Sequence, residues 1–116
     1  MTKNKHLENA ATAIKETRYI DFKREFDPSK LEQRCELVKD IVAFANSGGG
    51  VIVIGIADDG TPSEIDCSHL DNLDPADVTN WVEKYTGYQF DEFSIERVLR
   101  GGAEYHALVI SETSVL

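Results

Sequence analysis

Residues 51–57, VIVIGIA, constrain the fold more than any other stretch of the sequence. A strand with one face in water alternates apolar and polar residues, whereas this run is apolar almost throughout. It therefore predicts a strand buried on both faces, and such a strand needs other elements to cover each side of its sheet. Because 116 residues is the usual size of one domain, we expect residues 1–116 to provide that cover within a single domain.

The covering helices are predicted from the spacing of apolar residues and from the residues typical of helix ends. Ser29 and Glu32 have the spacing of a capping box, and the helix that follows has an apolar stripe wide enough to be covered on more than one side. Asp74 begins a further helix and Gly87 ends it. Three helices are expected, over residues 5–15, about 30–46 and 75–86.

The other strands are predicted from alternation and from turn residues. The segment TRYIDFKREF alternates, so Asp21 and Lys23 share one face of a strand while Ile20 and Phe22 share the other. Asp-Gly and Gly-Gly pairs later in the chain are hairpin signals. The strands expected from these signals lie at 51–57, 63–66, 93–99 and 105–111. The expected fold is a small α/β (α+β) sandwich with a mixed sheet and the order α-β-α-β-β-α-β-β.

The net charge excludes one class of nucleic-acid-binding protein. The chain carries −9, so it cannot hold nucleic acid over its whole surface by neutralising phosphates. Residues 1–40 nevertheless contain nine Lys and Arg against eight Asp and Glu, whereas residues 41–116 contain three against thirteen. An anionic partner should therefore approach the first 40 residues, unless these mixed charges form only a solvated surface.

The glycines at 48–50 could belong to a phosphate-binding loop or to the end of a helix. A phosphate-binding loop follows a strand and opens a helix, so that free N–H groups and the positive helix end face the phosphate. Here the order is helix, glycines, strand, and no Lys-Ser or Lys-Thr follows. The glycines are therefore interpreted as a helix cap and a turn, and no nucleotide cofactor is expected.

Three carboxylates are candidates for a metal site, namely Glu16, Asp21 and Asp58. Asp21 lies beside Lys23 on a strand face, and Asp58 follows the end of the buried strand. Carboxylate oxygens suit Mg²⁺ or Mn²⁺, which nucleases use to activate water, and a lysine can stabilise charge that develops on phosphate. The same residues also fit a plainer interpretation, in which Asp21 and Lys23 form a solvated face and Asp58 is a turn residue.

Several short motifs together resemble the AlbA_2 domain of the Schlafen family. The matching residues are Glu16, Asp21-Phe22-Lys23, Ala43-Phe44-Ala45-Asn46, Gly48-Gly49, Gly55-Ile56 and Asp58-Asp59-Gly60. These motifs cover residues 16–60, and the later helix and strands agree with the domain in their order. The sequence departs from the family pattern at Asp21, where glutamate is usual and the side chain is therefore one methylene shorter.

The resemblance implies an AlbA_2-like fold and a role in nucleic-acid processing. Vertebrate Schlafen proteins include endoribonucleases that cut structured RNA such as tRNA with three carboxylates and a divalent metal. Carried over by position, the metal ligands are Glu16, Asp21 and Asp58, the cofactor is Mg²⁺ or Mn²⁺, and Lys23 assists these carboxylates in catalysis. We expect Arg18, Lys23 and Arg24 to contact nucleic acid, with RNA favoured over DNA.

Two other interpretations remain open, a non-catalytic DNA- or RNA-binding regulatory module and an oligomerisation scaffold of a larger effector. Because bacterial relatives usually carry this domain at the start of longer proteins, we expect residues 1–116 to be the N-terminal part of a longer protein or a subunit of a homo-oligomer. The sequence has no signal-peptide-like start, no apolar run of about 20 residues and only two cysteines. These features favour a cytoplasmic location without a membrane partner.

Overall fold

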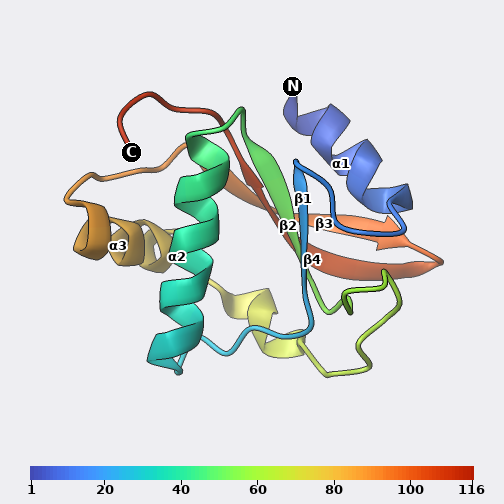
Figure 1. Cartoon of the computed structure of the whole chain (residues 1–116). Coiled ribbons are helices and arrows are strands. Elements are labelled where there is room, and N and C mark those ends of the chain that lie inside the picture. Colours follow the sequence, from blue (N-terminus) through green and yellow to red (C-terminus); the bar gives the residue numbers. More distant parts are fainter.

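The apolar run after the glycines forms the inner strand β2, Gly50–Ile54, all of whose residues are buried. The computed structural model describes residues 1–116 and places β2 between β1, Ile20–Lys23, and β4, Ala103–Ile110. β3, Phe93–Arg100, forms the far edge, so the strand order is β1-β2-β4-β3 (Figure 1). β1 runs parallel to β2, and the other neighbouring pairs are antiparallel. The predicted mixed sheet is confirmed.

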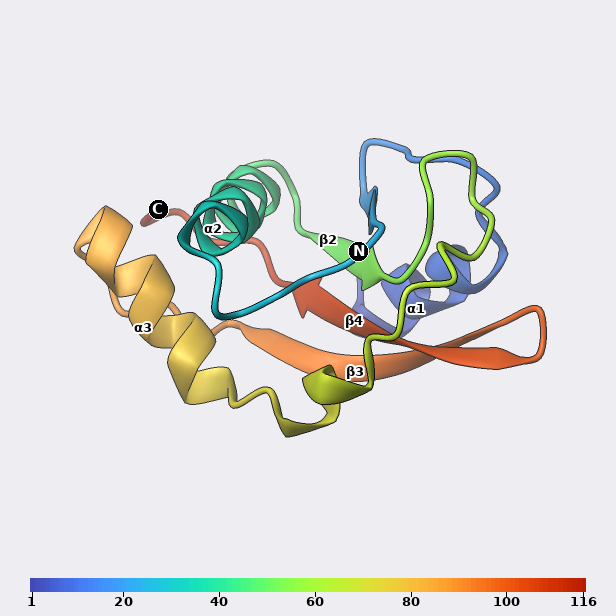
Figure 2. The ribbon, with the colours of Figure 1, turned by 90° about the horizontal axis from the view of Figure 1, so that it is seen from below.

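Helices cover both faces of this sheet, as the burial of β2 requires. α2, Leu31–Ala45, is the crossover between β1 and β2 and packs together with α3, Pro75–Thr86, on one face (Figure 1 and Figure 2). α1, Lys3–Thr12, packs on the other face. Alternate residues of β2 therefore enter two separate cores. Ile52 and Ile54 enter the core under α2, and Val51 and Val53 enter the core under α1.

The guanidinium of Arg100, at the end of β3, fixes the C-terminal end of α1. It donates hydrogen bonds to the carbonyl oxygens of Ala10 at 2.6 Å, Ala13 at 2.8 Å and Gly60 at 2.9 Å. The last carbonyls of a helix have no partner within the helix and carry partial negative charge, so a cation is favourable there. Arg100 thereby joins α1, the sheet and the turn that follows β2.

The ends of the helices are only partly as predicted. Asp74 caps α3 by accepting a hydrogen bond from the N–H of Ala76, and Gly87 ends that helix with a left-handed φ of 79°. The prediction of a capping box at the start of α2 is wrong. Ser29 donates instead to the carboxylate of Asp27, through its hydroxyl and its N–H, and α2 begins without a side-chain cap. Asp27 thus competes successfully for the hydroxyl that the helix would have used.

The prediction of a returning strand at 63–66 is also wrong. A single bridge joins Ile56 to Pro62, after which Glu64 adopts a positive φ of 63°. Proline has no N–H to donate, and a left-handed residue interrupts an extended backbone, so the pairing cannot continue. The chain instead crosses to a 3-10 helix, η1, at Ser68–Asn72.

The helices are short, and neither cysteine is paired. The longest helix, α2, has 15 residues, and none of the helices combines the length and apolar character needed to span a bilayer. Cys35 and Cys67 are both free thiols.

The core under α2 can be tested by truncation at Ile41, which is 0% exposed. Ile41→Ala should lower the free energy of unfolding by about 2–5 kcal/mol, because it removes buried contacts and leaves a cavity. Denaturant unfolding followed by circular dichroism measures the change. Val42, the next residue of the same helix, is only half-buried. Val42→Ala should therefore cost less, and an unchanged midpoint for Ile41→Ala would show that the core has been assigned wrongly.

His6 is buried between α1 and the sheet without a partner. Its exposed fraction is 2%, and neither ring nitrogen has a hydrogen-bond partner. The ring lies 6.0 Å from that of Tyr19. Burial, assisted by repulsion from the N-terminal amine, lowers the pKa of His6 below its ordinary value of 6.5.

Acid should therefore weaken folding through His6. The folded state keeps His6 neutral below pH 6.5, whereas the unfolded chain takes up a proton near that pH. The free energy of unfolding should consequently fall as the pH drops below about 6.5, and urea unfolding between pH 7 and pH 5 measures this. His6→Phe removes the proton uptake and should flatten the profile over this range, while every other titrating group remains. Parallel profiles for the two proteins would contradict the assignment.

Candidate functional site

β1 places two oppositely charged side chains on the sheet face that α2 covers. Ile20 and Phe22 belong to the core under α1, so the alternate residues Asp21 and Lys23 point toward α2. Lys23 Nζ lies 2.5 Å from Oδ2 of Asp40 on α2 and 3.1 Å from Oδ2 of Asp21. We call Asp21, Lys23 and Asp40 the Lys23 cluster. Its side chains are between 16% and 25% exposed, so the ion pairs are partly buried rather than fully solvated.

Asp21 is the least satisfied member of the Lys23 cluster. Its Oδ2 is buried and has no hydrogen-bond partner, since the 3.1 Å contact with Lys23 is an ion pair without hydrogen-bond angles. Burial raises the pKa of Asp21, the charge of Lys23 opposes that rise, and the neighbouring Glu16 carboxyl adds to it. Asp21 therefore carries its negative charge at a cost, which a proton or a further cation would relieve.

Lys23 keeps its positive charge. Burial acts to lower the pKa of Lys23, but the hydrogen bond and charge of Asp40, together with the charge of Asp21, outweigh burial and raise it. The cluster contains two carboxylates and one ammonium. The cluster therefore has a negative net charge and can bind a further cation, while the Lys23 ammonium stays fixed at its centre.

Glu16 reaches the Lys23 cluster from the loop before β1. β1 is an edge strand, and the backbone N–H of Phe22 is satisfied by Oε1 of Glu16 at 3.0 Å. A bridge between Thr17 and Ile20 forms the turn that brings Glu16 back along the strand. Glu16 thus has a structural role as a cap on the sheet edge, and the same position sets its carboxyl beside that of Asp21.

Asp58 is not part of this group. It lies in the turn after β2 and is exposed. That turn packs against the loop that leads to Glu16, because a Cβ on Gly60 would lie 2.5 Å from the carbonyl oxygen of Ile14 (Figure 2). No group of three or more His, Cys, Asp or Glu side chains in the structure is arranged to hold a metal ion. The structure therefore brings together Glu16, Asp21 and Lys23 but does not preassemble the three-carboxylate site.

A divalent metal nevertheless fits the two carboxylates that do meet. Mg²⁺ is usually held by one or two protein carboxylates, with water and substrate phosphate completing its six oxygen ligands. Glu16 and Asp21 supply two such groups, and the buried Oδ2 of Asp21 has no hydrogen-bond partner to give up. These residues thus suit an ion that is completed by a phosphate.

Two basic residues, Arg18 and Arg24, lie close to the Lys23 cluster in the sequence. Arg18 and Arg24 are both exposed, and neither is engaged in an ion pair. The Arg18 guanidinium lies over the ring of Tyr19, with Cζ 5.4 Å from the ring centroid. Both side chains lie within three residues of Asp21 along the chain and remain available to an anionic partner.

Asp40 was missed by the sequence analysis. In the sequence it follows Lys39, between Val38 and Ile41, which are 4% and 0% exposed in the structure. An acidic residue beside buried positions of a helix, with an unpaired lysine on the neighbouring strand, is the signal that could have found it. Only the docking of α2 on β1 shows that the two meet.

Comparison with known proteins identifies the chain's family. The sequence matches the family described as Schlafen, AlbA_2 over residues 16–114, a match that begins at Glu16 and includes every strand. A comparison with curated protein sequences gave no significant match. The crystal structure of the DIP2311 protein from Corynebacterium diphtheriae superposes with a TM-score of 0.59 at 20% identity, which shows a shared fold. The superposition covers 96% of this chain and 21% of that one. With most of its length matched, this chain belongs to the Schlafen AlbA_2 family.

Proposed function

We propose that this domain processes nucleic acid by cleaving phosphodiester bonds in structured RNA such as tRNA, and that the Lys23 cluster with Glu16 is its active centre. The observation that supports this most is Asp21. Its Oδ2 is buried without a hydrogen bond, beside a second carboxyl and a fixed ammonium. Groups whose pKa values are displaced by burial and by a specific charged neighbour gather at catalytic sites. Membership of the AlbA_2 family supports a role with nucleic acid.

Each residue has a chemical task in this proposal. Arg18 and Arg24 bind backbone phosphates and position the strand along the edge of β1. Lys23, held in place by Asp40, offers a fixed positive charge to the phosphate on which negative charge develops. Glu16 and Asp21 hold Mg²⁺ or Mn²⁺ together with that phosphate, and Asp58 is the remaining candidate ligand. When bound, the ion supplies an activated water and stabilises the leaving oxygen.

A binding role without catalysis is the second candidate. Lys23 is already paired with two carboxylates, and no three-carboxylate set is assembled. Arg18 and Arg24 alone could then hold RNA or DNA for a regulatory purpose. In either role the proposed place of action is the cytoplasm, where free thiols such as Cys35 and Cys67 persist.

The cleavage proposal predicts that the protein is a metal-dependent ribonuclease and that removal of the Asp21 charge greatly lowers its cleavage rate. With Mg²⁺ or Mn²⁺ the protein should cut structured RNA, and EDTA should stop it. Asp21→Asn should reduce the rate by about 100-fold or more while leaving thermal unfolding intact, because the amide keeps the shape and removes the charge. Asp77→Asn is the matched control on α3 and should cut at the wild-type rate. Full cleavage by Asp21→Asn would disprove the site.

Two further variants separate the candidate roles. Asp58→Asn should abolish cleavage only if Asp58 joins the metal on substrate binding. Lys23→Met should lower the cleavage rate more than the RNA affinity if the ammonium acts on the transition state, and the affinity alone if it only attracts phosphate. Salt-sensitive binding without any cleavage by the wild type would favour the binding role.

Metal binding itself should depend on RNA. Because the protein presents only two adjoining carboxylates, Mn²⁺ should bind weakly to the free protein and at least ten times more tightly in the presence of a non-cleavable RNA. Electron paramagnetic resonance of free Mn²⁺ measures this, after subtraction of the Mn²⁺ bound by RNA alone. Asp21→Asn should lose the enhancement. Tight Mn²⁺ binding to the free protein would instead indicate a preformed site.

A further inference from the structure

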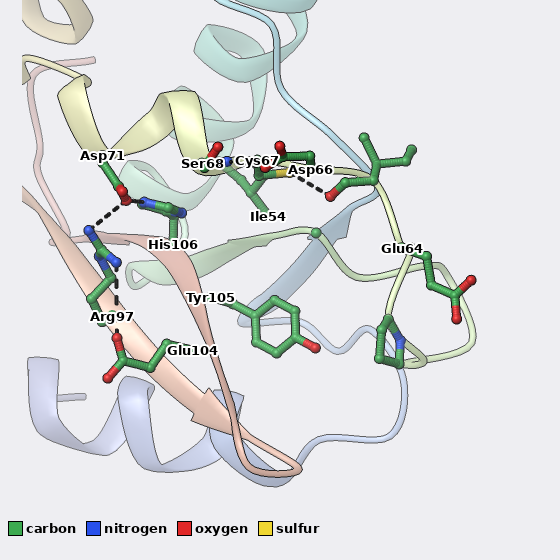
Figure 3. A pocket seen from close by; sticks show the side chains of 13 residues that line it. Ile54, Glu64, Asp66, Cys67, Ser68, Asp71, Arg97, Glu104, Tyr105 and His106 are labelled. Atoms are coloured by element: carbon green, nitrogen blue, oxygen red, sulfur yellow. Dashed lines mark hydrogen bonds and ion pairs between the residues drawn. The ribbon is translucent and has the colours of Figure 1, made fainter.

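A pocket lies away from the Lys23 cluster, where the 62–68 segment passes the end of β2, the beginning of β4 and Arg97 of β3 (Figure 3). It has a volume of about 390 Å³. None of Glu16, Asp21, Lys23 or Asp58 lines it. The proposed RNA chemistry does not use this pocket.

His106 presents an unused hydrogen-bond acceptor to this pocket. The residue is 9% exposed, and its Nε2 lies 2.7 Å from Oδ1 of Asp71 on η1. A carboxylate can only accept, so Nε2 of the neutral ring carries the proton and Nδ1 is left with a lone pair. Figure 3 shows this second nitrogen pointing into the pocket, and no hydrogen bond engages it.

The single cation that lines the pocket is already engaged. Arg97 donates to the same Oδ1 of Asp71 at 2.8 Å, and its other nitrogen lies 4.0 Å from Glu104. The lining contains four carboxylates, those of Glu64, Asp66, Asp71 and Glu104, against this one guanidinium. The pocket therefore has a negative potential, which repels phosphate and attracts a cation.

The body of the pocket is aromatic and apolar. The ring of Tyr105 lies at its centre in Figure 3, beside the backbone of Gly55, where an added Cβ would come within 3.2 Å of that ring. Ile54 and Ile65 complete the apolar part. An aromatic face in a negative field binds organic cations well.

We propose that this pocket binds an organic cation, a protonated amine or a guanidinium. Its N–H group donates to Nδ1 of His106, its charge is balanced by the acidic lining, and its carbon chain lies against Tyr105. The ligand is either a free polyamine or the lysine or arginine side chain of a protein partner. This function is independent of the proposed RNA cleavage.

Nuclear magnetic resonance titration of the whole chain tests the proposal with two probes, spermidine and a blocked tripeptide with one central arginine. Either probe should shift the ring resonances of His106 and Tyr105 saturably, and the tighter of the two identifies the source. His106→Phe keeps the ring volume but removes the acceptor, so it should weaken binding at least tenfold. Glu83→Gln, which removes an exposed charge from α3, controls for the general acidity of the chain and should bind as the wild type does.

The outcomes separate a site from non-specific attraction. Equal affinity in wild type and His106→Phe, shifts spread over the acidic surface, or preferential binding of adenosine monophosphate would each overturn the proposal. Thermal unfolding of His106→Phe shows whether the variant is folded. If it is not, Tyr105→Leu takes its place, with the same tenfold loss expected from removal of the aromatic face.

Discussion

The burial of β2 on both faces determines the rest of the structure. Its residues enter two separate cores, so the sheet cannot leave either face in water and the chain must supply helices to both. α2 and α3 do so on one side with a large apolar surface. α1 does so on the other with ten residues, aided by Arg100 at its C-terminal end. Charged side chains are thereby excluded from the middle of the sheet and confined to its edges and ends.

This exclusion explains where the candidate chemistry lies. β1 is short, lies at an edge and is only partly covered by α2, so it can carry Asp21 and Lys23 on a face where β2 carries Ile52 and Ile54. Partial cover by α2 also makes the ionised form of Asp21 unfavourable. Bringing Asp21 out of water raises its pKa, and a nearby lysine repays only part of the desolvation cost. If Asp21 and Lys23 were fully exposed, the pKa of Asp21 would not be raised by burial. If they were fully buried, a substrate could not reach them.

The sequence predicted what depends on local pattern. The apolar run of β2, the alternation at Asp21 and Lys23, the cap at Asp74 and the hairpin at Gly101-Gly102 each follow from residues close together in the chain. The errors arose where a nearby competitor intervened, as Asp27 did for Ser29, or where one residue broke a pairing, as Glu64 did after Pro62.

The sites required contacts between distant segments. Asp40 meets Lys23 only because α2 docks across β1, 17 residues further along the chain. His106 gains its orientation from Asp71, 35 residues away. The structure shows that one ring nitrogen is satisfied while the other faces a pocket. No short-range pattern contains that distinction.

The uneven distribution of charge along the chain accounts for the opposite preferences of the two proposed sites, one for an anion and one for a cation. The first 40 residues are nearly neutral and expose Arg18 and Arg24, which are close in the sequence to the Lys23 cluster. Residues 41–116 hold thirteen of the acidic side chains, and four of these line the pocket beside His106. A polyanion is therefore attracted to one end of β1 and repelled from the surface around β3 and β4. Repulsion of this kind contributes to specificity, since it excludes orientations in which the phosphate backbone would lie across the acidic face. In the proposed function, a chain with a net charge of −9 would therefore bind RNA only at the place where acidic side chains do not repel the phosphates.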